Sequence, residues 1–200
     1  MNVRHRVKSL CKLQRRRDTT CNMKLGEYGV LDKKKVKFSI TTHHSEVLLD
    51  CIHVCIWGPV KTASLGGHRY FLSFIDNISR HCWIYPMRQR FEALGMLVKW
   101  KDMMEKQTGR KIKELQIGNV ERCKNQFLRF GQNTGIGTHF TDGIHELAKE
   151  INCFLLEKAL CLLSNAQLDK SFWDEAIVYA SHLINELLST AIGGKTPLEV

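Results

Sequence analysis

Residues 47–57 read VLLDCIHVCIW and are followed directly by Gly58 and Pro59. This apolar run predicts a buried strand, because β-branched residues recur in it and a glycine-proline pair closes it. Residues 68–76 (HRYFLSFID) and 81–87 (HCWIYPM) have a similar composition and are separated by a short polar turn. They predict two antiparallel neighbours. The three runs together predict a three-strand antiparallel meander.

The periodicity changes after this meander. Apolar residues then recur at helical spacing, which predicts an amphipathic helix over residues 90–106 that ends at Gly109. Ser171 is the expected N-cap of the last helix. The further expected elements are strands at 111–117 and 138–140 and helices at 124–132, 145–163 and 171–188. This order predicts an α/β fold in which helices flank a mixed sheet, with the meander extended by two further strands.

The length and composition are those of one globular domain with a tail. The chain has 200 residues, of which 44% are hydrophobic and 25% are charged, with only 3 prolines. No apolar run is long enough for a transmembrane helix, and no apolar core follows the basic N-terminus as it would in a signal peptide. We therefore expect an intracellular protein without a membrane partner.

The positive charge is concentrated in the first 37 residues. They hold 12 Lys and Arg against 3 Asp and Glu, whereas residues 38–200 hold 18 against 17. A basic segment of this kind suggests a partner that carries phosphates or an anionic surface. A solvated tail without a partner is the alternative from composition.

Cysteine is frequent, but its spacing does not form a metal-binding motif. No C-x-x-C occurs, and no pair of histidines at metal-finger spacing accompanies the closest two cysteines. Buried or free thiols are therefore favoured over a zinc site. The eight cysteines are Cys11, Cys21, Cys51, Cys55, Cys82, Cys123, Cys153 and Cys161.

Several long sequence motifs (called words below) occur in a characteristic order along the chain. They are LGGHRYFLSFID at 65–76, SRHCWIYPM at 79–87, TGRKIKEL at 108–115, FLLEKALCLLSNAQLDKSFWDEA at 154–176 and GGKTPLEV at 193–200. In these words the chain resembles the integrase core of copia-type long-terminal-repeat retrotransposons. The resemblance implies an RNase H-like fold over residues 46–200. It also implies a poorly ordered basic remnant of a zinc-binding segment over residues 1–45.

The same resemblance implies DNA integration with Mg²⁺ or Mn²⁺ and three carboxylates. In the family the acids lie in words like HSDVWGP, DNG and NGVAERMN, which here read HVCIWGP at 53–59, GNV at 118–120 and HELAKEIN at 145–152. Cys55, Gly118 and Lys149 therefore stand at the three acid positions. Because two hard cations need oxygen ligands, no catalytic residue is expected to be intact.

Neighbouring acids offer only partial replacements. Asp50 lies at an odd offset from Cys55, so it faces the other side of a regular strand. Glu150 is one step around the helix from Lys149. Glu146 shares the helix face of Lys149 and is the candidate stand-in. Asp76, at the end of its predicted strand, could lie nearby, but one or two such acids do not form a two-metal centre.

The expected zinc site has also lost ligands. In the family its last word is like CEYCVLGK, and here Gly26 and Gly29 stand at the two cysteine positions. A tetrahedral site cannot close without them, so this segment should be loosely ordered and no cofactor is expected. The spacing of Cys11 and Cys21 does not support a replacement.

Nucleic-acid binding depends on summed charge and should survive better than catalysis. The basic residues Lys33, Lys34, Lys35 and Lys37 match a basic word of the family, and Arg15, Arg16 and Arg17 form a second cluster outside the resemblance. They predict weak, salt-sensitive and non-specific binding to DNA. A nuclear-localisation-like or merely solvated run is the alternative. The strand aromatics are expected in the core rather than in base stacking.

The sequence thus predicts an integrase-type domain that has lost its transposition chemistry but keeps weak contact with DNA. Its homo-oligomerisation, as in the family, is compatible with this prediction. Two alternatives stay open: a recruited, non-catalytic module for nucleic-acid or protein partners, and a pseudogene product with no selected role.

Overall fold

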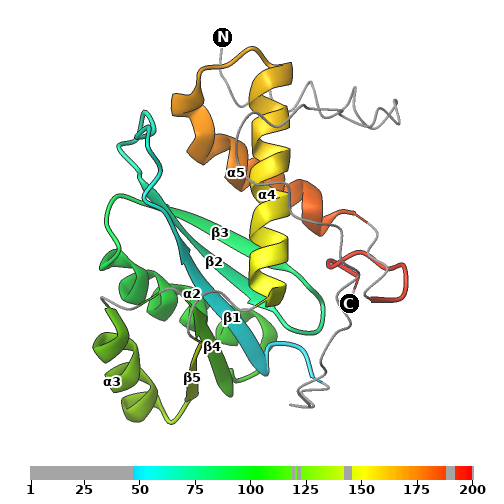
Figure 1. Cartoon of the computed structure of the whole chain (residues 1–200). Helices are drawn as coiled ribbons and strands as arrows, with labels where there is room; N and C mark the ends of the chain where they lie inside the picture. The colour runs from blue at the N-terminus through cyan, green and yellow to red at the C-terminus, as the bar shows by residue number, and fades with distance from the viewer. Residues whose placement is uncertain (1–46, 119, 121–122, 142–145, 188–191, 200) are drawn as a thin grey trace.

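A computed structural model of the chain describes residues 47–118, 120, 123–141, 146–187 and 192–199. Its centre is a five-stranded sheet with the order β3-β2-β1-β4-β5 (Figure 1). β1, β2 and β3 form an antiparallel meander, and β4 and β5 continue the sheet in parallel with β1. The strands are β1 (Cys51–Trp57), β2 (Tyr70–Asp76), β3 (Cys82–Met87), β4 (Glu114–Gly118) and β5 (Gly137–Thr141). The predicted mixed sheet is confirmed.

Helices cover both faces of this sheet (Figure 1). One face packs against α2 (Glu92–Thr108) and α3 (Lys124–Thr134). The other packs against α4 (Glu146–Asn165) and α5 (Trp173–Asn185), which are joined through the short 3-10 helix η2 (Lys170–Phe172). None of the helices in the described part of the chain is sufficiently long and apolar to cross a bilayer.

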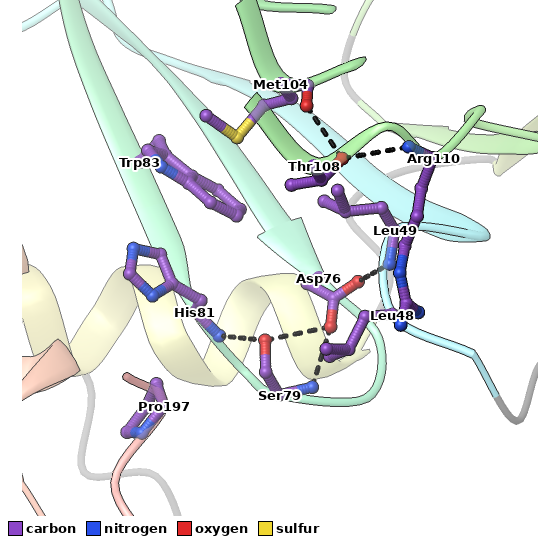
Figure 2. Close-up of a pocket in the computed structure, with 10 residues that line it drawn as sticks. All are labelled: Leu48, Leu49, Asp76, Ser79, His81, Trp83, Met104, Thr108, Arg110 and Pro197. Atoms are coloured by element: carbon purple, nitrogen blue, oxygen red, sulfur yellow. Dashed lines mark hydrogen bonds between the residues drawn. The ribbon is translucent and has the colours of Figure 1, made fainter. Parts of the chain in front are cut away.

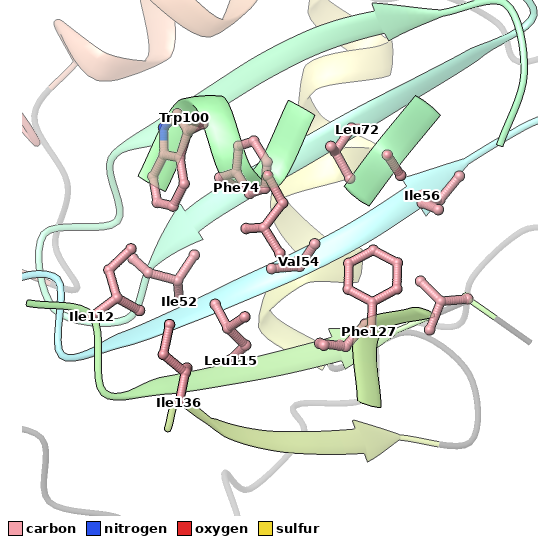
Figure 3. Packing of buried hydrophobic residues seen from close by; sticks show 14 of the residues in the cluster. Ile52, Val54, Ile56, Leu72, Phe74, Trp100, Ile112, Leu115, Phe127 and Ile136 are labelled. Carbon is pink, nitrogen blue, oxygen red and sulfur yellow. The ribbon is translucent and has the colours of Figure 1, made fainter. Parts of the chain in front are cut away.

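The alternation of side chains along β1 divides the core into two layers. Ile52, Val54 and Ile56 point to the layer under α2 and α3. Figure 3 shows this layer, in which the Trp100 ring stacks on Phe74 with a centroid separation of 4.3 Å. Cys55, at an odd position of the same strand, belongs to the layer under α4 and α5. A shift of one residue along β1 would exchange the two sets.

The ends of the helices follow local chemistry, with one correction. Gly109 takes a left-handed conformation with φ of 68° after α2, as predicted, and its N–H donates to the carbonyl of Glu105 at 3.0 Å. Ser171 is not the N-cap of the last helix. Asp169 caps η2 instead, because its carboxylate accepts the Ser171 N–H at 2.8 Å, and α5 begins only at Trp173.

Candidate functional site

The first two predicted acid positions lie side by side in the sheet. Cys55 in β1 and Gly118 in β4 are register partners in the parallel pair. Neighbouring strands are about 4.8 Å apart, and side chains at such paired positions extend from the same face. The fold therefore brings together the two sequence words in which the resemblance places the first and second carboxylates.

Cys55 lies in a dry environment. Its side chain is 1% exposed, and its backbone carbonyl accepts a hydrogen bond from Ser73 Oγ at 3.3 Å. Burial raises the pKa of the Cys55 thiol to about 12. The thiol is therefore neutral near pH 7, whereas metal binding by cysteine requires the thiolate.

The third position approaches the same region from the helical layer. Lys149 lies in the first turn of α4 and is exposed. α4 contacts β1, and Ala148, the residue before Lys149, belongs to the same buried cluster as Cys55. Cys55 and the first turn of α4 thus share the buried layer on one side of the sheet, whereas the Lys149 side chain itself is exposed.

The residues present at these positions do not fit a hard divalent cation. A neutral buried thiol at Cys55, a glycine at 118 and the ammonium group of Lys149 provide no oxygen side-chain ligand. Within the described ranges, no three His, Cys, Asp or Glu side chains are grouped so that they could hold a metal ion. We therefore assign no reaction step to a metal here.

The candidate stand-in lies at the start of α4. Glu146 is the first residue of this helix, and its side chain lies outside the described part of the structure. Glu150 follows Lys149 and is exposed. The role of Glu146 as a replacement ligand stays a prediction.

Asp76 has a structural role at the other end of the meander. Its Oδ1 accepts the Leu49 N–H at 2.8 Å, and its Oδ2 accepts hydrogen bonds from Ile78 N, Ser79 N and Ser79 Oγ at 2.7 to 3.1 Å. Asp76 is three residues beyond Ser73, the register partner of Cys55, so it points to the opposite face of the sheet. It therefore organises the β2–β3 turn and does not face the Cys55 position.

Asp50 is likewise engaged elsewhere. Its Oδ2 lies 2.7 Å from Lys113 Nζ, at the entrance to β1 and β4. Cys51, the next residue, is buried, and burial together with the negative charge of Glu114, Asp76 and Asp50 raises the pKa of its thiol to about 11. Cys51 and Cys55 are thus protonated thiols that form no disulfide.

The remaining predicted site residues belong to the N-terminal segment. They lie outside the described residues, so their predicted roles in nucleic-acid and zinc binding stay predictions. These are the basic residues Arg15, Arg16, Arg17, Lys33, Lys34, Lys35 and Lys37, and the former ligand positions Gly26 and Gly29.

Asn152 was not singled out from the sequence. It is fully buried on the face of α4 that also carries Ala148 and Leu155, and neither its amide nitrogen nor its oxygen has a hydrogen-bond partner in the described structure. The signal was present, because an asparagine interrupts an otherwise apolar helix face. A buried amide without hydrogen-bond partners lowers the stability of the fold, so packing does not explain why an asparagine stands at position 152.

A second polar group missed in the sequence ties α5 to β3. The Oδ1 of Asn185 accepts the Cys82 N–H at 2.9 Å, and its Nδ2 donates to the Cys82 carbonyl at 2.8 Å. The same Nδ2 lies 3.1 Å from His81 Nε2, which therefore accepts as a neutral ring nitrogen. Burial lowers the pKa of His81, partly opposed by its hydrogen bond to the backbone of Pro197.

Curated relatives are polyproteins of plant transposons. The chain is 31% identical over 183 residues to the retrovirus-related Pol polyprotein from transposon TNT 1-94 of Nicotiana tabacum, which covers 87% of this chain and 14% of the relative. It is 28% identical over 170 residues to the corresponding polyprotein from transposon RE1 of Arabidopsis thaliana, covering 82% and 11%. The chain thus spans about one seventh or less of these relatives. No family model matches the chain.

Solved structures with the same fold are retroviral integrases. The catalytic core domain of HTLV-2 integrase in complex with magnesium, in its dimeric form, has a TM-score of 0.57 at 13% identity, covering 77% of this chain and 97% of that one. The simian T-cell lymphotropic virus intasome in complex with PP2A regulatory subunit B56 gamma has a TM-score of 0.58 at 14% identity, covering 76% and 53%. At this identity the likeness establishes the fold, which is the predicted RNase H-like one. The chain is therefore a homologue of the retrovirus-related Pol polyproteins of transposons and folds as an integrase-type core.

Proposed function

We propose that this chain is an integrase-type core without strand-transfer activity that contacts DNA through its basic N-terminal segment. One observation carries the first part of the proposal. Cys55 and Gly118 are register partners, Lys149 lies on the helix that packs against β1, and none of the three carries a carboxylate.

The chemistry of phosphodiester transfer explains why these substitutions are decisive. Two cations about 4 Å apart must stabilise the attacking and the leaving oxygen, and Mg²⁺ takes oxygen ligands. Removing one carboxylate weakens such a centre, and the chain lacks all three at the matched positions. The ammonium group of Lys149 adds a repulsive charge beside the place where a cation would bind.

A reversion experiment tests this proposal. The triple variant Cys55→Asp, Gly118→Asp, Lys149→Glu should gain Mn²⁺ binding, measured by calorimetry and as a Mn²⁺-dependent rise in Tm. The wild-type chain should show neither, and the double variant that keeps Lys149 should bind at least tenfold more weakly than the triple variant. Equal Mn²⁺ binding by the wild type and the triple variant would contradict the proposal.

Catalysis is tested directly on oligonucleotide duplexes with Mg²⁺ or Mn²⁺. The wild-type chain should form no strand-transfer product. Because Glu146 is the candidate replacement ligand, Glu146→Gln is measured in parallel, with Glu157→Gln on an exposed position of α4 as its control. Product formation by the wild type that Glu146→Gln alone abolishes would overturn the inactive assignment.

The DNA contact is proposed from charge. Cations that neutralise phosphates release counterions, so the logarithm of the binding constant falls with the logarithm of salt concentration, by about 0.9 per phosphate contact. Replacing Arg15, Arg16 and Arg17 by alanine should therefore reduce the slope by up to about 3. The matched control replaces three exposed cations of the helical layer: Lys99, Lys106 and Arg129. If the two triple variants showed the same salt dependence of DNA binding, the cluster of Arg15, Arg16 and Arg17 would not be the DNA contact.

We also propose that the chain self-associates. The support is that HTLV-2 integrase core domains were solved in dimeric and trimeric forms and share this fold. Light scattering coupled to size exclusion at several concentrations tests this, and a monomer mass throughout the range would contradict it.

A further inference from the structure

A small pocket lies where the β2–β3 turn, the end of α2 and the C-terminal segment meet, at the opposite end of the meander from the Cys55 position. Its volume is about 160 Å³. Leu48, Leu49, Trp83, Met104 and Pro197 provide its apolar walls (Figure 2). The His81 ring lies against Trp83 with a centroid distance of 4.2 Å, which holds the indole in place at the pocket wall.

Most polar groups in the pocket are already engaged with each other. Asp76 accepts hydrogen bonds from Leu49 N, Ile78 N, Ser79 N and Ser79 Oγ. Thr108 Oγ1 donates to the Met104 carbonyl at 2.7 Å and accepts the Arg110 N–H at 3.2 Å. The hydrogen-bonding capacity of these groups is thus used within the protein, without a ligand.

Arg110 differs from its neighbours. Lys111 Nζ lies 3.0 Å from Glu105, and Lys113 Nζ lies 2.7 Å from Asp50. The Arg110 guanidinium lines the pocket, and within the described part of the chain no hydrogen bond or ion pair engages it. Figure 2 shows the Arg110 side chain running beside Leu49. An exposed positive group without a partner, at the edge of an apolar pocket, is an arrangement that suits a small amphipathic anion.

The volume of the pocket limits the size of the ligand that fits. A cavity of about 150 Å³ in a protein core accommodates one benzene ring. We propose that this pocket binds a small aromatic carboxylate, whose ring lies among Leu49, Trp83 and Met104 and whose carboxylate pairs with Arg110. This site goes beyond the proposed function, because it uses neither the three acid positions nor the basic segment. A phosphate ester of the same ring size presents the same chemistry and is distinguished by the experiment.

The ligand test uses the full chain and four probes: benzoate, phenyl phosphate, benzyl alcohol and acetate. Binding is followed by the indole N–H resonances in NMR spectra, because only Trp83 of the four tryptophans lines the pocket. Benzoate should bind in the millimolar range or better, with its shifts largest at Trp83, and at least tenfold more tightly than benzyl alcohol or acetate. Tighter binding of phenyl phosphate would assign the site to phosphate esters and overturn the carboxylate.

Two variants separate this site from non-specific anion binding. Arg110→Gln should weaken benzoate binding by about tenfold or more, because it removes a charged hydrogen-bond partner. Lys106→Gln, an exposed cation of α2 outside the pocket, should leave binding unchanged. Both variants change exposed side chains, and their Tm confirms folding. Equal affinity of Arg110→Gln and wild type, or equal binding of acetate and benzoate, would overturn the proposal.

Discussion

Cys55 in β1 and Gly118 in β4 are register partners, and the thiol of Cys55 lies in the buried layer that also contains Ala148 of α4. At the two positions where the family resemblance predicts carboxylates, the structure has a buried neutral thiol beside a residue without a side chain. Because the contact between β1 and α4 passes through this layer, Cys55 is part of the core, and changes there should affect stability.

Cys55→Asp should reduce the free energy of unfolding by about 2–4 kcal/mol at pH 7, because it places an unpaired carboxylate in a dry site. Burial raises the pKa of such a carboxyl above that of the unfolded chain. The penalty is therefore complete above the folded-state pKa and disappears as the group is protonated at lower pH. Urea denaturation at pH 7 and pH 4.5 measures this, relative to wild type at each pH. Cys55→Ala is the control, and an equal loss for both variants at pH 7 would contradict the argument.

Asn152→Leu should stabilise the chain by about 1–2 kcal/mol, because it removes a buried amide without partners in the described structure. Thermal and urea denaturation measure the change. Asn133→Leu on an exposed position of α3 is the control and should have little effect. A clear loss of stability in Asn152→Leu would indicate that the amide is engaged after all, and Asn152→Ala separates that result from overpacking.

Stability should fall as the pH is lowered through the range of histidine titration. The folded pKa of His81 is lowered, chiefly by burial, so the unfolded chain binds more protons in this range. The His81 contribution is present above its unfolded pKa of about 6.5 and is lost below it, by at most about 1.4 kcal/mol per pH unit. Asp76 raises this pKa and His182 lowers it, and both effects are smaller than that of burial.

Urea denaturation between pH 7.5 and 5 checks this dependence. His81→Gln should flatten the curve, because it removes the titrating group. Asn133→Gln, a change without a titrating group at an exposed position of α3, should leave the slope unchanged. The same slope in wild type and His81→Gln would show that another group is responsible.

Asp76→Asn should cost about 2–4 kcal/mol, because an amide cannot accept all four hydrogen bonds that the carboxylate receives at the β2–β3 turn. Asp102→Asn is the matched control. The Asp102 carboxylate is exposed, and its ion pair with Lys101 Nζ is long, at 3.9 Å, so this substitution should change the free energy of unfolding by less than about 1 kcal/mol. Chemical denaturation measures both. If Asp76→Asn lowered the free energy of unfolding no more than the control does, the structural role assigned to Asp76 would be wrong.

Much of the fold was readable from local patterns. The three runs that end at Trp57, Asp76 and Met87 form the predicted meander, and the glycine at 109 ends the helix that the periodicity places before it. The observed ends of several helices and strands differ by a few residues from the predicted ends, because tertiary contacts as well as local signals decide where an element ends. Ser171 shows the limit of such signals, because it lies within η2, where its N–H donates to the Asp169 carboxylate, and α5 begins only at Trp173.

The sequence by itself determined the order of strands and helices along the chain and the residues that stand at the three predicted acid positions, since both depend on short sequence motifs. Only the tertiary structure decided that Cys55 and Gly118 are register partners and that Asp76 faces the other side of the sheet. It also decided that the Asn152 amide and the Arg110 guanidinium lack partners in the described part of the chain. The reason is physical: alternation and helical period are set within a few residues, whereas register, burial and the pairing of polar groups depend on segments distant in the chain.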